Sequence, residues 1–119
     1  MTIASLKGDR AFQRLRKGRA GHANYLSTRW MPDQNGQVRV GIVVNKQVGK
    51  AVVRNRVRRR LREALRVLML ERSISPEASF KGNPSFALVV IARPEAAQAD
   101  FQQLKDALAH ALKKGKLLL

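Results

Sequence analysis

Residues 39–63 read RVGIVVNKQVGKAVVRNRVRRRLRE, and this stretch decides the fold. It begins with apolar residues that alternate as in a strand, passes through a short loop that contains Gly49, and continues into a helix. Between residues 53 and 68 the apolar positions step by three and four, which places them in one stripe along a helix. We therefore expect a long helix from Val52 to Arg72 whose apolar stripe packs against the core.

The flanking sequence adds strands and helices. Runs of β-branched and aromatic residues predict strands, the cluster Pro32-Asp33-Gln34-Asn35-Gly36 predicts a hairpin turn, and three-and-four spacing predicts helices. The expected elements are a helix at Asp9–Arg16, a further strand within Gly21–Arg29, hairpin strands at Tyr25–Met31 and Gln37–Asn45, an exposed loop at 73–85, a strand at Phe86–Ala92 and a helix at Asp100–Lys114. This order indicates an α/β sandwich in a single domain over residues 1–119.

The charge of the chain indicates a large anionic partner. The 119 residues carry a formal net charge of +16, far more than solubility requires, and nucleic acid is the leading candidate. A membrane surface would also attract this charge, but no stretch approaches the roughly 18 to 20 consecutive apolar residues of a spanning helix, so we expect no membrane partner. The sequence starts without an apolar export segment, and we expect a cytoplasmic location.

Several kinds of site are excluded or not indicated. Without cysteine the chain has no disulfide, no thiolate nucleophile and no cysteine-bearing zinc site. Hydrolysis by a protein would require paired carboxylates with metals, or cooperating histidines. His22 and His110 lie on separate elements without a partner motif, and the aspartates show no metal-ligand spacing. We therefore expect no catalytic residue and no metal ligand in the protein.

Arginines surround the apolar stripe of the long helix. On a helical wheel one group points away from the stripe, namely Asn55, Arg59, Arg62 and Arg66. A second group flanks the stripe, with Arg54 and Arg58 on one side and Arg56 and Arg60 on the other. Planar guanidinium groups suit phosphate oxygens, and Lys46 and Lys50 add charge beside the positive end of the helix, so backbone binding is favoured over base reading. The alternative is that individual arginines are only solvated, or pair with Glu63 or Glu71.

The same stretch, residues 39–63, resembles the signature of the bacterial ribonuclease P protein family. Asp9-Arg10-Ala11-Phe12-Gln13 is similar to the N-terminal helix of that family, and residues 86–94, FALVVIARP, are similar to its last strand. The resemblance covers nearly the whole chain apart from residues 73–85. It implies an α+β fold of the ribosomal protein S5 domain 2-like type, with a small mixed sheet, helices and a left-handed βαβ crossover. Sequence pattern alone would predict a right-handed one.

The resemblance also implies a function. It suggests the RNA-binding protein subunit of an endoribonuclease, one that assists a catalytic RNA in removing the 5′ leader from precursor tRNA. The partners would be the catalytic RNA, bound one to one, and the single-stranded leader. The cofactor would be Mg²⁺, bound mainly by the RNA, which would carry out the chemistry.

The family pattern assigns residues to two binding surfaces. The residues expected to contact the catalytic RNA are Lys50, Arg54, Asn55, Arg56, Arg58, Arg59, Arg60 and Arg62. The residues expected to contact the leader are Phe12, Arg16, Trp30 and Lys46, with the two aromatic rings stacking on unpaired bases. Arg16 departs from the pattern, because the family commonly has a second aromatic residue there. The alternatives are that Phe12 is a core residue and that Trp30 packs within the hairpin.

Three other functions share some of these features. A structural RNA-binding protein, such as a ribosomal protein, would have the same charge and would lack catalytic groups. A self-sufficient nuclease would cut RNA without an RNA subunit. A DNA-compacting protein would prefer duplex DNA, although no dimer or groove-reading helix pattern is evident.

Overall fold

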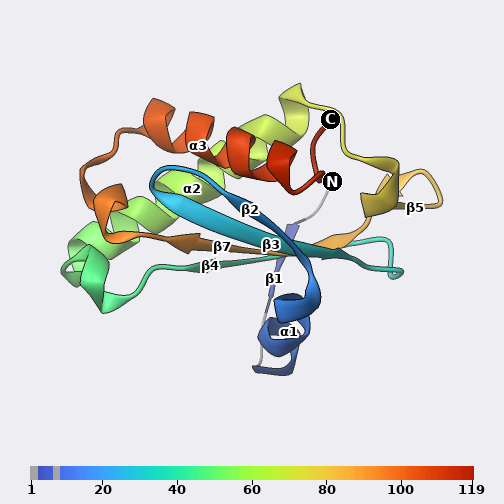
Figure 1. The fold of residues 1–119 in the computed structure, drawn as a ribbon, viewed down its shortest axis with the longest axis horizontal. Helices are drawn as coiled ribbons and strands as arrows, with labels where there is room; N and C mark the ends of the chain where they lie inside the picture. The colour runs from blue at the N-terminus through green and yellow to red at the C-terminus, as the bar shows by residue number, and fades with distance from the viewer. Residues whose placement is uncertain (1–2, 7–8) are drawn as a thin grey trace.

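The structure is a computed structural model, and it describes residues 3–6 and 9–119. A five-stranded sheet in the order β1-β4-β7-β3-β2 lies between helices (Figure 1). Its strands are β1 (Ile3–Ser5), β2 (Arg19–His22), β3 (Leu26–Pro32), β4 (Val38–Val43) and β7 (Phe86–Ala92). The α-helices are α1 (Asp9–Arg14), α2 (Ala51–Glu71) and α3 (Phe101–Lys114).

The sheet contains both parallel and antiparallel pairs. β4 pairs in parallel with β1 and β7, whereas β3 pairs antiparallel with β7 and β2. At the centre Leu88 lies between Val40 of β4 and Trp30 of β3. This mixed sheet with helices confirms the predicted α+β class.

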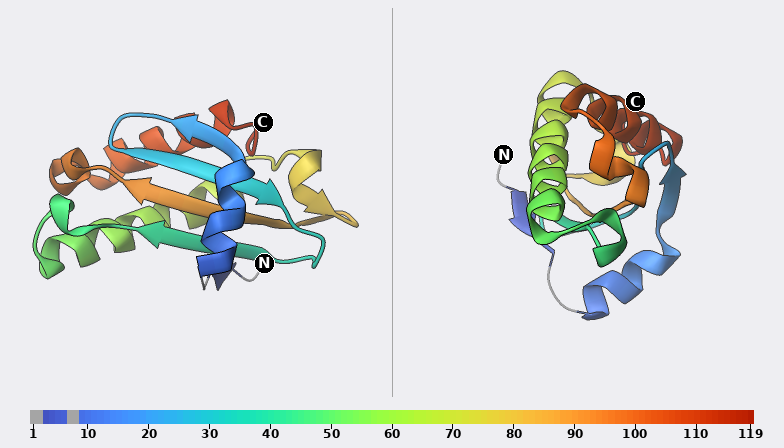
Figure 2. Two further views of the ribbon diagram at one scale, coloured as in Figure 1. Left: turned by 60° about the horizontal axis from the view of Figure 1, so that its bottom comes forward. Right: turned by 90° about the vertical axis from the view of Figure 1, so that its left-hand side faces the viewer.

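α2 joins two parallel neighbours, β4 and β7. In the left view of Figure 2 both arrows point left, β7 lies above β4, and α2 passes behind the sheet. The path from β4 through α2 to β7 is therefore left-handed. Such crossovers are rare because the twist of a strand favours the opposite hand. The left-handed crossover that the family resemblance implies is confirmed.

Helices cover the sheet on both faces. α2 and α3 lie on one face and α1 lies on the other (Figures 1 and 2). β7 is buried on both sides, as predicted: Phe86 and Leu88 belong to the core beneath α2 and α3, whereas Ala87 and Val89 pack with Leu15 on the α1 side. Removal of this apolar surface from water is the main stabilising term. α1 and α2 consequently cover opposite faces of the sheet.

Several predicted boundaries are wrong. The first helix ends at Arg14 and tightens into the 3₁₀ helix η1 (Leu15–Lys17), and the strand expected within residues 21–29 is β2, which ends at His22. Residues 73–85 are more than a loop, because they contain the 3₁₀ helix η3 (Pro76–Ala78) and a small hairpin of β5 (Ser79–Phe80) and β6 (Asn83–Pro84). β1 was not predicted, since a strand this short carries no periodicity and forms only along the edge of β4.

The last helix, α3, begins one residue after the predicted start, because Asp100 is its N-cap, and it ends at the predicted Lys114. The side chain of Asp100 accepts the backbone N–H of Gln103 at 2.8 Å, and the side chain of Gln103 accepts the backbone N–H of Asp100 at 3.0 Å. This reciprocal cap satisfies free N–H groups of the first turn and fixes the start of α3.

Candidate nucleic-acid interface

The outer side of α2 carries exposed polar and basic residues. Asn55, Arg59 and Arg62 are all exposed, as the helical wheel predicts. Ion pairs among the described residues are Arg19–Glu77, Arg39–Asp33, Arg66–Glu63 and Lys105–Glu71. Within that part of the chain Arg59 and Arg62 therefore have no carboxylate partner. Their guanidinium groups are free to bind phosphate.

Arg56 and Arg60 lie on the side of α2 that faces the 3₁₀ helix η4 (Pro94–Gln98). Nη1 of Arg60 donates to the backbone oxygen of Ala99 at 2.8 Å, and Nη2 of Arg56 donates to that of Ala97 at 3.3 Å. Both side chains are half-buried. These arginines hold α2 against the segment that follows β7, and only part of each guanidinium remains for RNA.

Arg54 and Arg58 flank the apolar stripe on the opposite side. Nη1 of Arg58 donates to Oδ1 of Asn55 at 3.0 Å. The Nε atoms of Arg54 and Arg56 are buried, and they meet no acceptor in the described ranges. A buried donor without a partner costs free energy, so these two Nε–H groups reduce the stability of the fold.

Positive charge continues beyond the first turn of α2. Lys46 belongs to the 3₁₀ helix η2 (Lys46–Val48), and Lys50 immediately precedes α2. Within the described residues, the N-cap residue Lys50 makes no side-chain capping hydrogen bond to α2, and the first turn of α2 holds no acidic residue. The exposed lysines therefore reinforce the positive end of the helix dipole. Lys46, which is expected to contact the leader, therefore lies near the start of α2, beside residues that are expected to contact the catalytic RNA.

The middle of α2 is partly neutralised. Arg66 donates to Glu63 through Nη2 at 2.6 Å and through Nε at 3.0 Å. These hydrogen bonds hold the pKa of the Glu63 carboxyl below its ordinary value and raise the pKa of Arg66. The alternative that an arginine pairs with Glu63 is therefore correct for Arg66, whose guanidinium is less available to a phosphate. It does not hold for the neighbouring Arg62.

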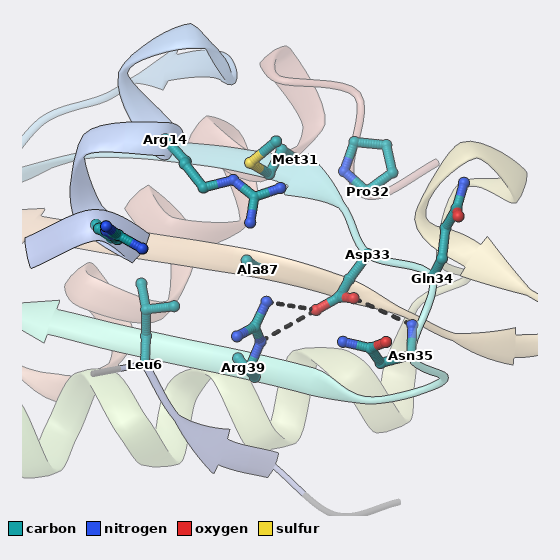
Figure 3. Close-up of a pocket in the computed structure, with 10 residues that line it drawn as sticks. Leu6, Arg14, Met31, Pro32, Asp33, Gln34, Asn35, Arg39 and Ala87 are labelled. Atoms are coloured by element: carbon teal, nitrogen blue, oxygen red, sulfur yellow. Dashed lines mark hydrogen bonds and ion pairs between the residues drawn. The ribbon is translucent and has the colours of Figure 1, made fainter. Parts of the chain in front are cut away.

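A second surface lies on the α1 side of the sheet. A cavity of about 740 Å³ opens between α1, the sheet and the turn that joins β3 to β4 (Figure 3). Its volume is within the roughly 300–1,000 Å³ that small-molecule sites occupy. The residues that line it are Leu6, Arg10, Arg14, Met31, Pro32, Asp33, Gln34, Asn35, Arg39 and Ala87.

Phe12 lies between α1 and β4, next to this cavity. Its half-buried ring packs on Gly41, where an added methyl group would come within 3.0 Å of Cζ. It also lines a neighbouring hollow of about 450 Å³ that reaches Arg62 of α2. Arg16 is exposed in η1, and its backbone oxygen accepts Nη1 of Arg29 at 2.9 Å. Phe12 and Arg16 are therefore accessible on the α1 side.

The expectation that Trp30 stacks on leader bases is wrong. Its side chain is 0% exposed and belongs to the core beneath α2 and α3. Its Nε1 donates to the backbone oxygen of Gly115 at 2.7 Å, just beyond the end of α3. The register of β3 turns Leu26, Thr28 and Trp30 to that face, so the alternative that Trp30 is a packing residue is correct.

Residues that the sequence reasoning missed lie around the cavity. Arg10 and Arg14 approach from α1, and Arg39 pairs with Asp33 across the β3–β4 turn. The hairpin pattern could have indicated the pair of Arg39 and Asp33, because these two residues stand on either side of the turn glycine, Gly36.

The part of the chain that the structure describes contains neither a metal-binding cluster nor a membrane-spanning helix. Residues 3–6 and 9–119 bring together no three histidine, cysteine, aspartate or glutamate side chains that could hold a metal ion. None of the described helices is long and apolar enough to span a membrane.

Fold and site together define a class: a small basic α+β protein whose crossover helix displays arginines suited to a polyanion. The family model described as Ribonuclease P matches residues 2–116. The ribonuclease P protein component of Thermus thermophilus is 53% identical over 116 residues, which are 98% of this chain and 62% of that protein. The component of Listeria monocytogenes is 33% identical over 95% of this chain and 88% of its own length.

Solved structures agree with these sequence matches. The Staphylococcus aureus RNase P protein superposes with a TM-score of 0.77 at 26% identity, covering 99% of this chain and all of that one. The Thermotoga maritima protein gives 0.73 at 25% identity, covering 92% and 96%. The chain belongs to the ribonuclease P protein family. It spans less than two thirds of the length of its Thermus thermophilus relative.

Proposed function

We propose that this protein is the RNA-binding subunit of ribonuclease P, which removes the 5′ leader from precursor tRNA. In this proposal one protein binds one catalytic RNA, the RNA performs the cleavage, and the protein also holds the single-stranded leader. The complex acts in the cytoplasm. Family membership supports this function, and the charge distribution on α2 supports it independently.

The observation that carries the proposal is the set of arginines on α2 that have no carboxylate partner among the described residues. A net charge of +16 would repel itself in a protein that had no polyanionic partner. We assign to the catalytic RNA Lys50, Arg54, Asn55, Arg56, Arg58, Arg59, Arg60 and Arg62. Arg59 and Arg62 offer their whole guanidinium, whereas Arg56 and Arg60 offer part of theirs.

We assign the leader to the α1 side of the sheet. The partly exposed ring of Phe12 and the exposed guanidinium of Arg16 are planar groups on which unpaired bases can stack. The cavity beside Arg10 and Arg14 has room for a nucleotide. Lys46, at the start of α2, would meet phosphates where the strand approaches the catalytic RNA. Trp30 takes no part, because it is buried.

We propose that the Mg²⁺ needed for cleavage is bound mainly by the RNA. The described residues bring together no cluster of side chains that could hold a metal ion, and the role that we propose for the protein requires none. The contribution of the protein is electrostatic: it reduces the repulsion between catalytic RNA and substrate. Its effect is therefore expected to be largest at low Mg²⁺, and RNA binding is expected to weaken steeply with salt.

Cleavage of a precursor tRNA by the matching catalytic RNA at low Mg²⁺, with and without the protein, tests this function. We expect cleavage only when both components are present, and none by the protein alone. Cleavage by the protein alone would instead identify a self-sufficient nuclease. Binding without any gain in cleavage would leave a structural RNA-binding role, and preference for duplex DNA over structured RNA would indicate a DNA-compacting protein.

A further inference from the structure

Arg39 and Asp33 form a fixed pair at one end of the cavity in Figure 3. Nε and Nη2 of Arg39 both donate to Oδ2 of Asp33, at 3.0 and 2.7 Å. Oδ1 of the same carboxylate accepts the backbone N–H of Asn35 at 3.1 Å, and the side chain of Asp33 is only 8% exposed. The turn therefore holds the carboxylate, and the carboxylate sets the plane of the guanidinium.

The fixed guanidinium keeps a free edge. Asp33 occupies Nε and one proton of Nη2, which leaves the second Nη2 proton and both Nη1 protons as donors. Figure 3 shows the remaining nitrogen pointing away from Asp33, toward Leu6. The Arg39 side chain is 32% exposed, so a ligand in the cavity can reach this edge. Two parallel N–H donors are thus presented in a set orientation.

Two parallel donors match a base edge that carries two adjacent acceptors. Guanine offers O6 and N7 in this arrangement, and this edge is the commonest specific partner of arginine in nucleic acids. Adenine places an amino donor beside N7, so one of the two hydrogen bonds would be lost. Bases of unpaired RNA expose these edges to a protein.

The rest of the cavity suits the remainder of a nucleotide. Ala87 on β7 lies between Arg39 and Arg14 in Figure 3, and its small side chain leaves room above the sheet. Met31 lies beside it, and its thioether makes favourable contacts with aromatic rings. Arg10 and Arg14 add positive charge along the α1 side, where a phosphate of the same strand can be neutralised.

We propose that this cavity is a guanine-selective subsite for single-stranded RNA. Arg39 is its specificity-determining residue, and Asp33 positions the Arg39 guanidinium. The identification of that RNA as the leader rests on the proposed function. The recognition of guanine itself requires only an unpaired strand.

Binding of short single-stranded RNA oligonucleotides to the intact protein tests the subsite. The oligonucleotides carry a fluorescent label and differ only in one central base, and affinity is measured by fluorescence anisotropy. We expect the guanine oligonucleotide to bind roughly tenfold more tightly than the adenine one, the discrimination that one bidentate pair provides. Arg39→Lys keeps the charge but loses the paired donors, so the preference for guanine is expected to disappear while binding of the adenine oligonucleotide changes little.

Two further variants make the result interpretable. Asp33→Asn keeps the size of the side chain and removes its charge, so it is expected to reduce the preference by loosening Arg39. Arg72→Lys, at the exposed C-terminal end of α2, is the matched control and should retain the preference. Thermal melting of each variant verifies that it is folded.

Three outcomes would overturn the proposal. These are equal binding of oligonucleotides with any of the four central bases, a preference for a base other than guanine, and a preference for guanine that survives in Arg39→Lys. The catalytic RNA is absent from these measurements. A negative result here therefore leaves the cleavage test unaffected, and a failed cleavage test leaves a measured guanine preference standing.

Discussion

The outer surface of α2 and the α1 face of the sheet both display arginine, but they hold it differently. Arg59 and Arg62 are exposed and have no carboxylate partner in the described part of the chain, whereas Arg39 is clamped by the nearly buried carboxylate of Asp33. A free guanidinium can follow a phosphate wherever an RNA backbone places it, while a fixed one accepts only an edge of matching geometry. The partners of an arginine, more than its charge, therefore separate backbone binding from base recognition.

The largest effect is expected at Trp30, which belongs to neither surface. Trp30→Ala removes a fully buried ring and its hydrogen bond to Gly115, and we expect the free energy of unfolding to fall by about 3–5 kcal/mol. Denaturant titration followed by circular dichroism measures this loss. Under conditions where the variant is still folded, it should bind single-stranded RNA like the unchanged protein. Selective loss of RNA binding at unchanged stability would return Trp30 to the leader site.

The next effect separates arginines within α2. Arg60→Ala removes the hydrogen bond to Ala99, and because the donor is charged and half-buried we expect a loss of about 1–2 kcal/mol in the free energy of unfolding. Arg59→Ala is the matched control on the exposed side and should leave stability within about 0.5 kcal/mol. Equal stability of the two variants would mean that the hydrogen bond from Arg60 to Ala99 contributes nothing to the free energy of unfolding.

The same pair should behave in the reverse order toward RNA. Arg59→Ala is expected to weaken binding of the catalytic RNA and to reduce the slope of log K against log salt by about one, because one phosphate contact is lost. Arg60→Ala should change this slope less, since part of its guanidinium is occupied by Ala99. A salt titration of both variants measures the difference. Identical slopes would show that the hydrogen bond from Arg60 to Ala99 does not reduce the contribution of Arg60 to RNA binding.

Local pattern was sufficient for the elements that carry their own periodicity. α2 ends one residue from the predicted limit at each end, β7 has the predicted limits, and the apolar stripe of α2 is buried at Val57, Leu61 and Leu68. A helical wheel also predicted which polar side chains of α2 are exposed, because a helix fixes the direction of each side chain relative to its neighbours. The left-handed crossover came from the family resemblance alone.

Features that depend on distant contacts could not be predicted in this way. Both faces of β3 carry a large side chain, Trp30 on one and Met31 on the other, so alternation alone did not decide which faces α3. The acceptors of Arg56 and Arg60 lie about forty residues away in sequence, on a segment that only the fold brings alongside α2. The cavity has the same origin, since α1 and the β3–β4 turn meet across the sheet.

The smallest effect is expected at Glu63, where one carboxylate interrupts the free charge of α2. The hydrogen bonds from Arg66 lower the pKa of Glu63, so the carboxylate is ionised at neutral pH, and its contribution to stability is lost only as the pH falls through that lowered pKa. Near pH 7 the pair is therefore intact, and Glu63→Gln is the way to release Arg66. We expect this variant to bind the catalytic RNA roughly twofold to fivefold more tightly at low salt, with a steeper salt slope.

Asp106→Asn on α3 is the matched control for Glu63→Gln, because it raises the net charge equally at a position away from the arginine row. If only net charge mattered, both variants would gain affinity to the same extent. A gain confined to Glu63→Gln would show instead that RNA contacts the outer row of α2 at the turn that contains Arg62 and Arg66. That result would add Arg66 to the exposed arginines of α2 that are available to RNA, and it would sharpen their difference from Arg39, which Asp33 holds in the cavity.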